Sequence, residues 1–167
     1  MIAVLLAEGF EELEALSPVD ILRRASLDVK TVGIGSRTVR GSHGIPVIAD
    51  LTENEVVLSE VEAVIFPGGM PGSLNLDASE FSDKIIDEVR KKGGRIAAIC
   101  AAPLVLGRRG LLNGKRATCF PGFENELAGA IVTPEGVVTD GNITTARSFD
   151  YAFAFGEELA RLLGKRD

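Results

Sequence analysis

Short, mainly apolar segments alternate along this chain with longer segments in which apolar residues recur every three or four positions. The apolar segments lie at residues 2–7, 29–34, 63–66 and 95–99, and they are typical of strands buried on both faces of a sheet. Helical spacing is seen at residues 10–25, 79–92, 101–109 and 149–163. Strands that alternate with helices form a mostly parallel sheet covered on both faces, so the pattern predicts an α/β fold.

Several positions interrupt or end these segments. Pro18 lies inside the first helical segment and should bend the helix or shift its start. Ser79 is a suitable N-cap for the second helix, and Gly93 with Gly94 should end it. Residues 38–49 contain two glycines and a proline between β-rich pieces, which predicts a hairpin-like excursion. Further short strands are predicted at residues 117–119, 130–133, 137–138 and 143–146.

Three loops directly follow buried strands, at residues 8–14, 67–72 and 100–103. In an open parallel sheet, functional groups gather at the carboxyl ends of the strands. We therefore expect these three loops to lie close together and to form the functional site.

The composition is that of an ordinary globular domain. Of 167 residues, 46% are hydrophobic and 25% are charged, and we expect one domain over residues 1–167. The net charge of −6, without a basic stripe, argues against nucleic acid and anionic membranes as partners. No apolar stretch approaches the ~18 residues of a membrane span. Residues 1–7 lack the flanking features of an export signal, and two cysteines make no disulfide framework, so we expect a cytoplasmic location.

Cys100 carries the clearest chemical signal. An apolar strand leads directly into it, and Ala101 and Ala102 are small enough for a tight turn into a helix, as in a nucleophile elbow. A thiol at such a turn faces unpaired N–H groups and the positive end of a helix dipole, which favours the thiolate. The alternative is that Cys100 is a small buried hydrophobic residue.

Two other segments could assist a reactive thiol. The turn at residues 67–72 (PGGMPG) could offer backbone N–H groups to an oxyanion, or could simply be a tight turn that needs glycine. Glu11, Glu12 and Glu14 open the first helix, where acidic residues usually complement the dipole. Glu14 lies on a semi-apolar helix face, where burial would raise its pKa towards neutrality. Glu11 lies on a similar face, so geometry alone does not distinguish the two.

The remaining candidate residues have simpler interpretations. His43, the only histidine, is far along the chain from Cys100 and is expected to be a solvated loop residue, which argues against a Cys–His dyad. Cys119 is expected to be structural. No histidine, cysteine and carboxylate cluster has metal-ligand spacing, so we expect no metal and no cofactor.

Five segments in order form a specific combination: residues 8–15 (EGFEELEA), 18–20 (PVD), 66–69 (FPGG), 97–103 (AAICAAP) and 117–121 (ATCFP). This combination spans nearly the whole chain and resembles the ThiJ/PfpI superfamily, in its DJ-one branch. The resemblance implies a flavodoxin-like three-layer sandwich, related to class I glutamine amidotransferase domains and usually a homodimer. It also implies that Cys100 is the nucleophile, that Glu14 is its hydrogen-bonding partner, and that the N–H groups of Gly69 and Ala101 bind an oxyanion.

The family's activities include cofactor-free glyoxalase, protein deglycase, redox sensing, chaperoning and, in one branch, proteolysis. From this resemblance we expect a stress-protective enzyme that acts on small reactive carbonyls such as methylglyoxal, free or as early adducts on proteins. The alternative is a redox-sensing or chaperone-like protein in which Cys100 is oxidised without turnover.

Three places depart from the family pattern. Phe120 stands where a histidine often precedes Pro121, and Ala101 stands where the proteolytic branch has a histidine after the cysteine. Residues 147–150 (RSFD) replace a Gly-Pro-Gly-Thr stretch. A cysteine peptidase is therefore disfavoured, because the histidine that would act as its base is missing. Proton transfer would depend on Glu14.

Overall fold

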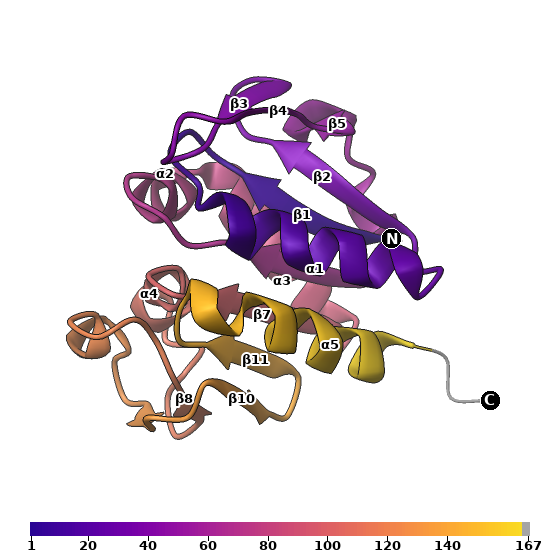
Figure 1. Cartoon of the computed structure of the whole chain (residues 1–167). Coiled ribbons are helices and arrows are strands. Elements are labelled where there is room, and N and C mark those ends of the chain that lie inside the picture. The colour runs from indigo at the N-terminus through magenta and orange to yellow at the C-terminus, as the bar shows by residue number, and fades with distance from the viewer. Residues whose placement is uncertain (165–167) are drawn as a thin grey trace.

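A seven-stranded, mostly parallel sheet forms the centre of the computed structural model, which describes residues 1–164 (Figure 1). The strand order is β10-β11-β7-β6-β1-β2-β5, and β10 is the one strand that runs antiparallel to its neighbour. The strands are β1 (Ile2–Leu6), β2 (Val29–Gly33), β5 (Leu51–Thr52), β6 (Ala63–Phe66), β7 (Arg95–Ile99), β10 (Val137–Asp140) and β11 (Ile143–Ala146).

Helices cover both faces of this sheet. Helices α1 (Glu12–Arg24) and α5 (Ala152–Leu163) lie side by side on one face (Figure 1). The other face is covered by α2 (Gly72–Ala78), α3 (Glu80–Lys91) and α4 (Pro103–Arg108). Successive residues of a strand point to opposite faces, so Val4 packs in the core under α1 and α5, whereas Leu5 packs in the core under α3 and α4. This α/β arrangement is flavodoxin-like, as the sequence predicts.

Smaller elements extend from the sheet. Strands β3 (Thr38–Arg40) and β4 (Pro46–Ile48) form the predicted antiparallel hairpin, and β8 (Arg116–Ala117) pairs in parallel with β9 (Ile131–Val132). Single 3₁₀ turns occupy Glu53–Glu55, Leu58–Glu60, Glu124–Glu126 and Phe149–Tyr151. Within residues 1–164, no helix combines the length and the apolar character needed to cross a bilayer.

Several element boundaries differ from the sequence prediction. The helix after Cys100 begins at Pro103 rather than at residue 101, because residues 101 and 102 complete the turn. Residues 149–151 form a 3₁₀ turn before α5 instead of its first turn. Helix α1 begins at Glu12, two residues later than predicted, and runs through Pro18 to Arg24. Helix α2 and strand β5 were not predicted, because both are short and lack a clear apolar period.

Candidate active site

Cys100 occupies a strained turn between β7 and α4. Its φ of +66° lies in the left-handed region, which costs a residue other than glycine about 1–2 kcal/mol. Two backbone hydrogen bonds hold it there: its N–H donates to the carbonyl oxygen of Ala146 at 2.8 Å, and its carbonyl oxygen accepts from the N–H of Phe120 at 2.8 Å. The strained turn predicted from the sequence is therefore present, and the sheet keeps it in place.

Glu14 reaches the sulfur of Cys100 from the first turn of α1. Its side chain is buried, with 1% of the residue exposed, and a hydrogen bond joins it to the Cys100 thiol. Its Oε2 also accepts from the N–H of Gly68 at 2.9 Å. A Cβ at Gly68 would overlap Glu14 Oε2 and come within 2.7 Å of Cys100 Cβ. The contact between acid and thiol therefore depends on the absence of a side chain at residue 68.

The backbone N–H groups of Gly69 and Ala101 lie close enough to the Cys100 sulfur to lower its pKa as hydrogen-bond donors. Gly69 has a φ of +92°, and a Cβ there would overlap the backbone of the loop that precedes α1. The two loops are also joined directly, because the N–H of Glu11 donates to the carbonyl oxygen of Gly68 at 2.8 Å. The loops expected from the sequence thus converge at the carboxyl end of the sheet.

Glu11 has a different place from Glu14, which settles the choice that the helix pattern left open. Its side chain caps α1 by accepting from the N–H of Glu14 at 2.8 Å. It does not bond the thiol, although its charge lies near enough to raise the pKa of Glu14. Glu11 therefore orders the first turn of the helix that carries Glu14.

The acid and the thiol form a coupled pair. Burial raises the pKa of Glu14 to about 7, with a further rise from the charge of Glu11, although hydrogen bonds with Cys100 and Gly68 oppose the shift. Burial also raises the pKa of Cys100, as do the charge of Glu14 and its hydrogen bond. The N–H groups of Ala101 and Gly69 lower the Cys100 pKa, but by less. Because the charge of Glu14 raises the pKa of Cys100, the protonation of the thiol depends on that of the acid, and the two groups titrate as a coupled pair.

The backbone N–H groups at the turn lower the pKa of Cys100, as expected from the sequence, whereas burial and the charge of Glu14 oppose them. Helix α4 starts three residues after the thiol and is only six residues long, so its dipole contributes less than burial and the neighbouring carboxylate do. A thiolate at Cys100 is favoured when Glu14 is protonated, because the carboxylate charge that raises the Cys100 pKa is then absent. The expectation that burial raises the Glu14 pKa towards neutrality is confirmed.

Cys119 and Phe120 flank the site. Cys119 is buried, as expected, and burial together with the charge of Glu124 raises its pKa to about 11. Phe120, in the place of the histidine that the resemblance would have supplied, is exposed and contacts Cys100 through its backbone N–H. Phe120 offers no side chain that could act as a base.

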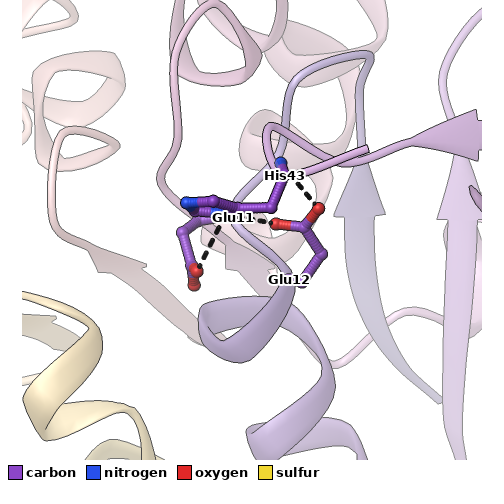
Figure 2. A group of neighbouring side chains, drawn as sticks. All are labelled: Glu11, Glu12 and His43. Carbon is purple, nitrogen blue, oxygen red and sulfur yellow. Dashed lines mark hydrogen bonds and ion pairs between the residues drawn. The ribbon is translucent and has the colours of Figure 1, made fainter. Parts of the chain in front are cut away.

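A second cluster, of Glu11, Glu12 and His43, lies at the N-terminal end of α1 (Figure 2). His43 is in the loop between β3 and β4, and its side chain is 69% exposed, as expected of a loop histidine. It is also paired, because its Nδ1 lies 2.9 Å from Oε2 of Glu12. A hydrogen bond with Glu12 and the charge of that carboxylate raise the pKa of His43. Sequence spacing could not reveal the contact, since the two residues are 31 positions apart.

Comparison with known proteins agrees with this geometry. The model of the DJ-1/PfpI family matches residues 1–162. Protein dj-1beta of Drosophila melanogaster is 35% identical over 164 residues, covering 94% of this chain and 88% of that protein. A Pyrococcus horikoshii protein named a deglycase is 31% identical, covering 95% of this chain and 96% of its own.

Solved structures agree as well. A mutant of a DJ-1 superfamily protein from Salmonella typhimurium superposes with a TM-score of 0.91 at 38% identity, covering 98% of this chain and 90% of that one. The crystal structure of Drosophila melanogaster DJ-1beta gives a TM-score of 0.92 at 32% identity, covering 99% and 90%. With its motifs, fold and relatives in agreement, the chain belongs to the DJ-1/PfpI family.

Proposed function

We propose that this protein is a cofactor-independent cysteine enzyme that acts on small reactive carbonyls, free or as early adducts on proteins. The observation that carries the proposal is the buried Glu14–Cys100 pair, which places an acid–base group next to a nucleophile. Two Pyrococcus relatives that are named deglycases, each 31% identical to this chain, support the same class of activity.

The first chemical step uses the Cys100 thiolate while Glu14 is protonated. With methylglyoxal as substrate, the sulfur attacks the aldehyde carbon and forms a carbon–sulfur bond, while the carbonyl oxygen takes up the negative charge. The N–H groups of Gly69 and Ala101 lie near the sulfur and would stabilise an oxyanion on the attacked carbon. Protonation of this oxygen gives a hemithioacetal.

Glu14 then moves a proton between two carbons of the adduct. As a carboxylate it removes the proton from the former aldehyde carbon, and as an acid it returns one to the neighbouring carbon, which leaves a thioester of a hydroxy acid. Water cleaves the thioester, giving lactate and restoring the thiol. A pKa of about 7 suits Glu14 to both roles, because both protonation states are populated at neutral pH.

A redox role without turnover is the second candidate. Cys100 is partly exposed, and the groups around its sulfur would hydrogen-bond the oxygens of a sulfinate as well as a carbonyl oxygen. Proteolysis has no comparable support, because the single histidine of the chain is paired with Glu12.

Methylglyoxal consumption by the purified protein tests the proposal, with lactate as the measured product. Cys100→Ala should abolish turnover, whereas Cys119→Ala, at the other cysteine, should retain it. Lactate formation that depends on Cys100 supports the enzyme. Addition of two oxygen atoms to Cys100 under mild peroxide, in a protein that makes no lactate, would instead support the redox role.

We further propose that the protein works in the cytoplasm as a homodimer and protects against carbonyl stress. Both cysteines are free thiols, which suits a reducing compartment. Helices α1 and α5 carry exposed apolar side chains at Leu13 and Phe153, which a second copy could cover. Sedimentation velocity at micromolar concentration should show a dimer, and a monomer alone would contradict this assembly.

A further inference from the structure

We propose that Glu11, Glu12 and His43 bind a divalent first-row transition-metal ion at the edge of a cavity next to the reactive pair. The sequence predicts no such site, because the histidine reaches the two carboxylates only when the β3–β4 hairpin folds over the start of α1 (Figures 1 and 2). The site is independent of the activity proposed for Cys100.

The distances between the three side chains suit a shared ion. Nδ1 of His43 lies 2.9 Å from Oε2 of Glu12 and 3.7 Å from Oε1 of Glu11. One ligand atom from each residue lies within 4.8 Å of the others. Ligand atoms bound tetrahedrally at about 2.1 Å from a zinc ion are about 3.4 Å apart, so small side-chain movements would suffice.

Backbone N–H groups bind one oxygen of each carboxylate, and the other oxygen faces His43. In Glu12, Oε1 accepts from the N–H of His43 at 2.8 Å and from that of Ile45 at 3.4 Å, while Oε2 faces the imidazole. In Glu11, Oε2 accepts from the N–H of Glu14 at 2.8 Å, while Oε1 faces the imidazole. Hydrogen bonds of this kind orient metal ligands in proteins.

Burial also fixes the position of the Glu12 side chain. The Glu12 side chain is only 6% exposed, and a Cβ at Gly41 would overlap its Oε1. The hairpin therefore closes around this carboxylate without a side chain to displace it. Glu12 needs little ordering on binding an ion.

A cavity of about 310 Å³ adjoins the three side chains and is otherwise lined by Leu13, Ile45 and Phe149. Of its lining residues in the described part of the chain, none is lysine or arginine, so two carboxylates dominate its charge. Three protein ligands leave a further coordination position for water or for an oxygen ligand in the cavity. Imidazole with carboxylates favours ions such as Zn²⁺ over Mg²⁺ or Ca²⁺.

Binding of Zn²⁺ and Co²⁺ to chelator-treated protein tests the site. Calorimetry should show one Zn²⁺ per chain, and Co²⁺ should give visible absorption bands of a four- or five-coordinate ion. Loss of an outer hydrogen-bond partner alone weakens metal binding by about 10- to 100-fold. We therefore expect His43→Ala and Glu11→Gln to weaken binding by about 100-fold or more.

The matched control is Cys100→Ala, because Cys100 and Glu14 are the other residues able to hold a metal nearby. This variant should lose carbonyl turnover and still bind Zn²⁺ as the unmodified protein does, so the two proposals can fail separately. His43 is exposed, so its removal should lower the melting temperature only slightly and leave the fold intact for the binding measurement. Absence of binding, binding that survives His43→Ala, or binding that disappears in Cys100→Ala would overturn the inference and leave the cluster as an ion pair that holds the hairpin.

Discussion

The cost of charging Glu14 inside the fold should appear directly in the stability of Glu14→Gln. Glutamine is nearly the same size and can keep both contacts, accepting from the N–H of Gly68 and donating to Cys100, but it cannot ionise. The substitution therefore removes the carboxylate charge while the surroundings stay the same. In the folded protein the Glu14 pKa is about 7, against an ordinary value of 4.5.

The sign follows from proton binding. Between pH 4.5 and 7 the folded protein holds a proton at Glu14 that the unfolded chain releases, so the free energy of unfolding falls as pH rises through this window. The difference between the two pKa values corresponds to about 3 kcal/mol, at 1.36 kcal/mol for each pH unit. Below pH 4.5 Glu14 is protonated in both the folded and the unfolded protein, so it no longer makes stability depend on pH.

Urea unfolding of both proteins at pH 4, 5, 6, 7 and 8 measures this effect. The free energy of unfolding of Glu14→Gln, compared with that of the unmodified protein, should rise by about 3 kcal/mol between the lowest and the highest pH. For a chain of this size, this corresponds to about 6–12 °C in melting temperature. Glu14→Gln combined with Cys100→Ala shows whether the thiol shares in the effect. A difference in the free energy of unfolding that stays constant with pH would refute the raised pKa of Glu14.

Three further outcomes are expected. Glu14→Gln should keep iodoacetamide alkylation of Cys100 at neutral pH, because glutamine still donates a hydrogen bond to the sulfur. It should lower methylglyoxal turnover by about 10²- to 10⁴-fold, the usual contribution of an acid–base group, and full turnover would remove Glu14 from the mechanism. Gly68→Ala should slow both alkylation and turnover, since its methyl group would overlap Glu14 Oε2, whereas Gly35→Ala, with open space around it, should change stability only. Equal rates in the two variants would contradict the dependence of the Glu14–Cys100 contact on glycine at residue 68. Because Cys100 has a φ of +66°, Cys100→Gly should be more stable to urea than Cys100→Ala by about 1 kcal/mol, and the reverse order would argue against strain in the turn.

The sequence by itself determined those features that depend on neighbouring residues. Strands β1, β6 and β7 are apolar throughout because both of their faces are covered, and α3 starts after the N-cap Ser79, whose side chain accepts from the N–H of Phe81. The turn at Cys100 was predictable for the same reason, since small residues follow an apolar strand directly. The place of the three loops at one end of the sheet then followed from parallel topology.

Only the tertiary structure decided which charged groups meet and what their meeting does. The opening acidic residues of α1 look alike in sequence, yet Glu11 caps the helix, Glu12 holds the hairpin and Glu14 touches the thiol. The pKa of Cys100 also depends on burial and on a carboxylate 86 positions away in the chain, and the local sequence around Cys100 contains neither. The contact between His43 and Glu12 could not be predicted for the same physical reason. It depends on how the hairpin packs against the helix, and the sequence pattern of neither segment contains that information.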